Sequence, residues 1–339
     1  LQRHPEWNVE PLRLTYHTGE EFRRLSEGLR RTHELLESRL LKSGDRLGHG
    51  LALGLPPKRW ANGAEQVAQP ADERLDDLLW ELDRYATGDI AIPPQRIEPV
   101  RREALELAAE IYGPESDPDI SIENLRRARA LRHEISELRR HGYGLLVGEA
   151  DNLTDPLYLR RDERSPRFGD RAADRLLSRY LYDEAVFRRG QRPVLVSWTN
   201  PELDVLEQLQ RWLLHEFSLR DITIESNPSS NLLIGAYQGL EEHPVMQLQP
   251  IGRTNPSTMP ISINDDNSLT FATCIADEYA HVFYALQRQG VSTDDALRWL
   301  KARQKTGWRS RFTLAASANL DALNKLFPVN GKRRRLGER

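Results

Sequence analysis

The sequence predicts an α/β protein in which a few strands form part of a barrel and a long, mainly helical segment interrupts them. The first observation is that three strand-like runs lead into groups that bind metals or move protons: His17-Thr-Gly-Glu20 follows Pro11–Tyr16, His49 ends Arg46–His49, and Asp265-Asp266 follows Pro260–Asn264. The second is that most of the chain between the last two motifs has helical periodicity. In a barrel the carboxyl ends of the strands meet at one mouth, so we expect these side chains to form one metal-assisted hydrolytic site there.

The composition excludes several classes of protein. The chain has 339 residues, 39% of them hydrophobic and 29% charged, with a net charge of −3, so no global positive field for nucleic acid is present. The single cysteine, Cys274, excludes a disulfide framework and a zinc site built from cysteines, and it is typical of a reducing compartment, for which we expect the cytoplasm. No apolar run reaches about 18 residues, so we expect no membrane span.

Residues 1–54 are expected to contain a strand, a helix and a second strand. Leu12, Leu14 and Tyr16 alternate with other residues, which is the period of a strand. Residues 20–41 are rich in Leu, Arg and Glu and predict a helix, after which Gly44-Asp45 turns the chain into the second strand.

Residues 55–190 are expected to form a mainly helical insertion. Apolar residues from Leu75 to Tyr85 follow the spacing of one amphipathic helix face, and further helices are predicted over 101–112, 122–138 and 171–188. The segment Arg160–Arg171 mixes charges of both signs and is interpreted as a solvated loop. Amphipathic helices of this extent need a cover, so we expect a lid or a subunit interface, and hence a homo-oligomer.

Residues 191–330 return to the order of the first segment, and residues 331–339 form a basic tail. The expected elements are a strand over 193–198, a helix over 200–217, strands over 221–225 and 260–264, a helix over 276–289, and a last helix that Ser292 caps.

Five motifs in this order resemble the adenosine and AMP deaminase superfamily. They are His17-Thr-Gly-Glu20, similar to the family's His-Ala-Gly-Glu; Gly48-His-Gly50, similar to Gly-His-Gly; Glu225–Asn231, similar to a Pro-x-Ser-Asn segment; His243-Pro244, similar to His-Pro; and Asp265-Asp266, similar to the paired aspartates. Each match is weak by itself, and the order of the five makes the signal specific over roughly residues 8–54 and 200–315. The resemblance implies a (β/α)₈ TIM-type barrel of which this chain carries the second half, strands 5–8, with strands 5 and 6 in 1–54 and strands 7 and 8 with closing helices in 191–330.

The resemblance also implies hydrolytic deamination of an adenine base with zinc as the cofactor. In that chemistry His17 and Asp265 would be zinc ligands. Glu20 would protonate the purine ring, His49 would polarise the attacking water, and Asp266 would hydrogen-bond the base. The residue types alone also favour metal-assisted hydrolysis, because a borderline cation takes nitrogen and oxygen ligands and proton transfer needs a carboxylate beside it. By themselves, however, Asp265 and Asp266 could also form a turn or a helix cap.

The chain departs from the family pattern in ways that affect the expectation. The family's zinc site also uses a His-x-His pair on the first strand, and none occurs among the nine histidines. Asn264 and Asn267 flank the aspartates where the family has Thr and Pro, which leaves the orientation of Asp266 open. Ten residues precede the first matching strand, whereas four strand–helix units need about 125 residues. We therefore expect the other barrel half, with its ligands, in upstream sequence or in another chain.

Three functions remain open from the sequence. The first is a zinc-dependent purine deaminase acting on a nucleoside, a nucleotide or an RNA base; its large insertion looks like the adenosine-deaminase-type component of bacterial antiphage RNA-editing systems. The second is an inactive deaminase-like scaffold. The third is a nucleic-acid-binding module using Arg160–Arg175 and Lys332–Arg335, which the acidic balance disfavours. A cytidine-deaminase zinc site and a zincin are excluded, because their cysteine and His-Glu-x-x-His motifs are absent.

Overall fold

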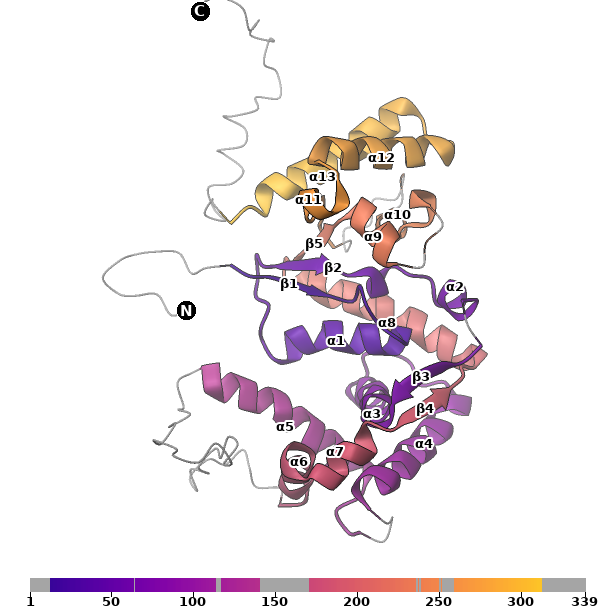
Figure 1. Ribbon diagram of the computed structural model, residues 1–339, viewed down its shortest axis with the longest axis vertical. Helices are drawn as coiled ribbons and strands as arrows, with labels where there is room; N and C mark the ends of the chain where they lie inside the picture. The colour runs from indigo at the N-terminus through magenta and orange to yellow at the C-terminus, as the bar shows by residue number, and fades with distance from the viewer. Residues whose placement is uncertain are drawn as a thin grey trace, which may run out of the picture. The chain divides into compact units, whose positions relative to one another are not determined.

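The computed structural model describes residues 13–63, 65–113, 117–140, 171–235, 237, 239–249, 251 and 259–312 (Figure 1). The chain divides into two compact units, each assembled from segments that are far apart in the sequence. The first unit consists of Leu1–Glu21, Leu41–Leu55 and Leu213–Arg339, and the second of Phe22–Leu40 and Pro56–Trp212. Most of the expected loop at 160–171 and the basic tail at 331–339 lie outside the described residues.

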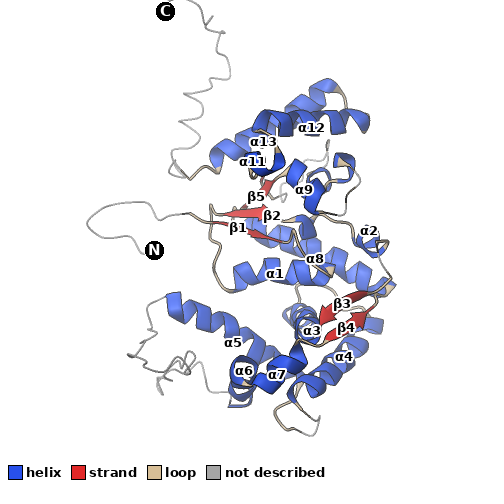
Figure 2. Ribbon diagram, in the orientation of Figure 1, coloured by secondary structure: helices blue, strands red, loops and turns tan. Residues whose placement is uncertain are grey.

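The first unit contains a four-stranded parallel sheet (Figure 2). Its strands are β1 (Thr15–Thr18), β2 (Arg46–His49), β5 (Thr223–Ser226) and β6 (Ile261–Ile263), in the order β1-β2-β5-β6. The expected α/β fold with a parallel sheet is confirmed, and the sheet is compatible with part of a barrel. Parallel pairing brings the four carboxyl ends to one edge, which is where the candidate residues follow.

The two faces of this sheet differ in chemistry, because side chains alternate along each strand. Leu47, Ile224 and Ile261 stand in register on one face and are fully buried. Thr15 and Arg46 are in register on the other face, where the Glu225 carboxylate accepts a hydrogen bond from Thr15 (2.5 Å) and pairs with Arg46 (2.6 Å). The apolar face supplies core, and the polar face is cross-linked through Glu225.

Short helices follow the strands of the first unit, and two longer helices follow β6. They are η1 (Leu51–Leu53), α9 (Pro228–Ile234), η3 (Leu240–Glu242), α10 (Pro244–Leu248), α11 (Ser268–Phe271), α12 (Ile275–Arg288) and α13 (Thr293–Arg309). Helix α13 packs against β6 and α12. The predicted cap is confirmed, since the Ser292 hydroxyl accepts a hydrogen bond from the Asp295 amide at the start of α13.

The second unit is mainly helical and contains one two-stranded sheet. Its elements are α1 (Leu25–Glu37), α2 (Pro57–Ala61), β3 (Val67–Pro70), α3 (Ala71–Thr87), α4 (Pro94–Tyr112), α5 (Ile122–Arg140), α6 (Arg171–Tyr182), α7 (Glu184–Gly190) and β4 (Pro193–Val196). Helix α8 (Asn200–Leu219) begins in this unit and ends in the first.

One local prediction in the second unit needs correction and another is confirmed. The single helix expected over 171–188 is two helices, because the Asp183 carboxylate accepts hydrogen bonds from the backbone amides of Ala185 and Val186 and so starts a new helix there. The strand expected at 193–198 is confirmed as β4, which pairs antiparallel with β3 in the two-stranded sheet.

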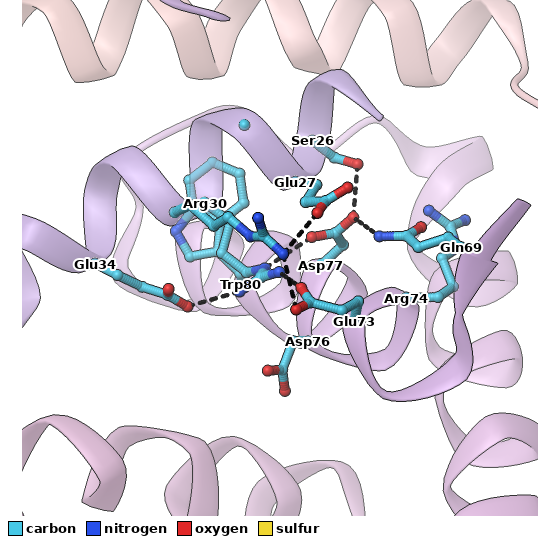
Figure 3. A network of polar contacts seen from close by, with 12 residues as sticks. Ser26, Glu27, Arg30, Glu34, Gln69, Glu73, Arg74, Asp76, Asp77 and Trp80 are labelled. Carbon is cyan, nitrogen blue, oxygen red and sulfur yellow. Dashed lines mark hydrogen bonds and ion pairs between the residues drawn. The ribbon is translucent and has the colours of Figure 1, made fainter. Parts of the chain in front are cut away.

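Charged side chains hold α1 against α3 inside the second unit (Figure 3). Arg30, whose side chain is only 4% exposed, pairs with Asp77 at 2.7 Å and with Glu34 at 2.8 Å, and it also pairs with Glu73. The Asp77 carboxylate accepts further hydrogen bonds from Ser26 and Gln69, both at 2.9 Å. Burying these charges is costly, so the network stabilises the helix pair only while every member keeps its partners.

Candidate functional site

His17 stands on β1, with its ring across the neighbouring strand. Its register partner on β2 is Gly48, and a Cβ atom at that position would lie only 2.1 Å from His17 Cδ2 and 2.8 Å from Nε2. Any residue other than glycine would therefore push the imidazole aside. This close approach is the physical reason for the first glycine of the Gly48-His-Gly50 motif.

His49 ends β2 in a backbone conformation that side chains rarely adopt. Its φ is 61°, and the next residue, Gly50, has a φ of 57°. A non-glycine residue in the left-handed region is uncommon and is held there by its surroundings, often at functional sites. The turn buries the His49 ring to 4% exposure and sets it edge-on to His17, with ring centroids 4.9 Å apart.

Glu20 reaches the same place from the loop after β1. The loop is fixed by backbone hydrogen bonds from Gly50 to Thr18 (3.2 Å) and from Ala52 to Gly19 (2.8 Å). Glu20 Oε2 lies 3.7 Å from His49 Nε2, and it is buried without a hydrogen-bond donor in the described structure. Burial raises the pKa of the Glu20 carboxyl, while His49 and His17 act in the opposite direction.

The three residues can offer ligand atoms to one cation. One nitrogen from His17, one from His49 and one carboxylate oxygen from Glu20 lie within 4.8 Å of one another. Nitrogen and oxygen ligands suit a borderline divalent ion such as zinc. Glu20 Oε2 accepts no hydrogen bond in the described structure, so a cation or a proton would compensate its buried negative charge.

The two aspartates are placed differently from each other. Asp266 Oδ2 lies 3.8 Å from His49 Nε2, and its residue has a φ of 52°, the second strained non-glycine position at the site. Asp265 Oδ2 accepts a hydrogen bond from Ser268 Oγ at 2.9 Å, and Asp265 does not belong to the cation cluster found among the described residues. The structure thus joins His17, Glu20, His49 and Asp266, and it leaves Asp265 outside this group.

Several buried polar residues at the site were given no role in the sequence interpretation. Asn231, on α9, is fully buried between His49 and His243, and the Nδ2 atom of Asn227 lies 3.4 Å from each ring nitrogen of His49. Both asparagines and His243 fall inside motifs that resemble the family. The available signal was their place in those motifs, because polar side chains that become buried need hydrogen-bond partners.

Glu278 fixes the helix that carries Asn231. It is 1% exposed, and its carboxylate accepts hydrogen bonds from the Ser229 backbone amide (2.9 Å) and the Thr273 hydroxyl (2.6 Å). The first turn of α9 is therefore tied to the start of α12.

A comparison with protein-family models gives a match over the segment that contains Asn231, His243 and the two aspartates. Residues 205–304 match the family model described as adenosine deaminase. The resemblance to the adenosine and AMP deaminase superfamily is confirmed. A comparison with curated proteins gives no match.

The adenosine deaminase match supports a deaminase-type, metal-dependent hydrolase function. It contains Glu225–Asn231, His243 and Asp265-Asp266, whereas His17, Glu20 and His49 lie outside it. The sheet connects the two sets, because β2 lies outside the matched segment and pairs with β5 inside it. Of the described helices, none is both long enough and apolar enough to cross a membrane.

Proposed function

We propose that the protein is a zinc-dependent hydrolytic deaminase that converts the adenine base of adenosine or an adenine nucleotide to the inosine product. The observation that carries the proposal is the cluster of His17, Glu20 and His49. It lies at the carboxyl edge of a sheet that continues through β5 into the segment matching adenosine deaminases. Metal-assisted hydrolysis with proton transfer requires a metal ligand such as His17 close to a carboxyl group that can carry the proton, such as Glu20.

In this proposal His17 and Asp265 would hold zinc, with the Asp265 carboxylate exchanging its hydrogen bond from Ser268 for the metal, and the bound zinc would supply a water of lowered pKa. Glu20 protonates a ring nitrogen of the purine, and its raised pKa supports that role, since a carboxyl of raised pKa keeps its proton at higher pH. His49 hydrogen-bonds the reacting oxygen, and Asp266 hydrogen-bonds the base. The proximity of Asp266 and Glu20 to the same His49 nitrogen supports their assignment to one site.

We also propose that the parallel sheet is the second half of a (β/α)₈ barrel. Strands β1 and β6 lie at the two ends of the order β1-β2-β5-β6, so each has one neighbour in this sheet. Within the described part of the chain the outer side of each edge strand has no strand partner, and such an edge favours pairing with further strands. The remaining strands and zinc ligands would come from elsewhere in the polypeptide or from another chain, and residues 55–190 would be the insertion.

The alternative function is an inactive deaminase-like scaffold or assembly subunit. Two observations favour it, and the first is that the Asp265 carboxylate accepts a hydrogen bond from Ser268, the arrangement of a turn. A second is that Leu181, Tyr182 and Phe187, on consecutive helices α6 and α7, are 46%, 42% and 60% exposed, which suits contact with a second copy of the chain. A role in antiviral defence would be compatible with either function.

Metal analysis combined with product analysis separates the two functions. The purified protein is assayed for bound metal and for inosine-type product from adenosine, AMP, ATP and RNA. Bound zinc with turnover of one of these substrates supports the enzyme. Absence of both zinc and turnover, with an oligomer in analytical ultracentrifugation, would establish the scaffold.

The role of Glu20 has its own test. We expect Glu20→Gln to keep the metal and lose turnover by a factor of about 10² or more, because the amide cannot deliver a proton. Glu21→Gln is the matched control, since Glu21 is the exposed neighbour and the same charge is removed. Loss of zinc in Glu20→Gln would make Glu20 a ligand and refute its role as the acid.

A further inference from the structure

A chain of buried polar groups runs from the start of α10 to the candidate site. The Val245 backbone amide donates to His243 Nδ1 at 3.0 Å, and His243 Nε2 lies 3.0 Å from the Asn231 amide position drawn as Nδ2. The position drawn as Asn231 Oδ1 lies 2.5 Å from His49 Nδ1. His243, Asn231 and His49 are 1%, 0% and 4% exposed, so water does not compete for these bonds.

The direction of every hydrogen bond in this series follows from the bond between the Val245 amide and His243 Nδ1. A backbone N–H can only donate, so His243 Nδ1 must accept, and a neutral imidazole then carries its proton on Nε2. That proton needs an acceptor, and Asn231 can offer one only if its amide is rotated by 180°, so that Oδ1 and Nδ2 exchange places and the oxygen faces His243. Burial lowers the pKa of His243 to about 3, which agrees with a neutral ring.

The Asn231 amide has one oxygen and one nitrogen, so the group that faces His49 follows from the group that faces His243. With the oxygen facing His243, the NH₂ group faces His49 and donates to Nδ1. The opposite amide orientation would require His243 to accept at both ring nitrogens, which neither its neutral nor its charged form can do. Asn227 also lies near the His49 ring, at 3.4 Å from both nitrogens, and so it does not select between them.

We propose that His243 and Asn231 are positioning residues that hold His49 in the tautomer with its proton on Nε2, directed at Glu20 and Asp266. The distances from Nε2 to their carboxylate oxygens are 3.7 Å and 3.8 Å. The proposal rests on the proposed function in so far as the reacting oxygen comes to this nitrogen. His49 then acts on that oxygen as a hydrogen-bond donor. The relay of His243 and Asn231 keeps Nε2 protonated, so Nε2 cannot remove a proton.

The tautomer is measured directly by ¹⁵N NMR of the histidine ring nitrogens, without substrate. The protein is labelled at histidine, and the His49 signals are assigned by their absence in His49→Gln. We expect Nδ1 of His49 to be unprotonated and Nε2 to be protonated. A proton on Nδ1 in the unmodified protein would overturn the proposal.

The relay itself is tested by Asn231→Asp, a change of nearly equal shape. A carboxylate has only acceptors, so His49 Nδ1 must then carry a proton, and its ¹⁵N signal changes to that of a protonated nitrogen. Asn267→Asp is the matched control, because it adds the same charge beside Asp266 but caps α11 and does not touch His49. His243→Gln retains a donor for Asn231 and should leave the His49 tautomer unchanged.

The kinetic consequence separates this proposal from the proposed function. We expect Asn231→Asp to lower kcat by about 10²-fold with KM little changed, because the donor acts on the reacting oxygen and not on ground-state binding. An unaltered His49 spectrum in Asn231→Asp refutes the relay even if the enzyme is active. The predicted spectra in a protein without deaminase activity would sustain the relay and refute the proposed function.

Discussion

Gly48→Ala is the change that most directly probes the candidate metal site. The new Cβ atom would lie 2.1 Å from His17 Cδ2. Ordinary carbon contacts begin at about 3.5 Å, so the His17 ring has to retreat by about 1.4 Å. Metal–ligand distances are held to about 0.2 Å, so a shift of this size removes His17 as a ligand.

We expect Gly48→Ala to weaken metal binding and turnover and to leave the stability of the fold nearly unchanged. The atoms that must move belong to an exposed side chain, and Gly48 has no left-handed φ, so we expect the melting temperature to stay near that of the unmodified protein. A misplacement of about 1 Å can cost about 10² in rate, and we expect at least that loss of turnover together with weakened metal binding.

The assay measures zinc affinity by competition with a chelator, the deamination rate and the melting temperature. Gly307→Ala in α13 is the control, because a Cβ there meets its nearest atom at an ordinary 3.6 Å. Unmodified zinc affinity in Gly48→Ala would refute the argument that His17 is a ligand held across this glycine. A large fall in the melting temperature would refute the argument that only the His17 side chain moves to relieve the clash.

Two further predictions concern stability. Burial lowers the pKa of His33 from 6.5 to about 3, so below pH 6.5 only the unfolded chain takes up this proton, and stability falls by about 1.4 kcal/mol per pH unit toward pH 3. His33→Gln keeps an acceptor for the Trp80 indole and should remove about 1 kcal/mol per pH unit of the pH dependence of the unfolding free energy between pH 6.5 and pH 5; an unchanged pH dependence contradicts the assignment. Glu278→Ala should lower the free energy of unfolding in urea by about 1–2 kcal/mol, because the part-buried Ser229 amide loses its acceptor, while Glu278→Gln, which keeps an acceptor, should lower it less.

Local patterns predicted much of the first unit. The alternation around Tyr16 and the runs ending at His49 and Asn264 indicated strands, and each is a strand of one parallel sheet. The motif order indicated the superfamily that the match over residues 205–304 confirms. These predictions succeeded because period and motif order are properties of neighbouring residues.

Other features depended on contacts between distant residues and were missed. The break at Asp183 and the pairing of β3 with β4 are decided by a capping carboxylate and by a partner strand more than 120 residues away. The pairing of Arg30 with Asp77 gives charged residues of α1 a buried role, where a helix rich in Arg and Glu indicates only a helix.

The sequence by itself determined which chemical groups the protein has at its strand ends: His17, Glu20, His49 and the paired aspartates. Only the tertiary structure decided which of them meet. Parallel pairing of β1 with β2 lays the His17 ring over Gly48, and the left-handed turn at His49 brings its ring toward Glu20 and Asp266. The physical reason is that ligand geometry depends on strand register and on buried hydrogen bonds, which join residues that the sequence separates.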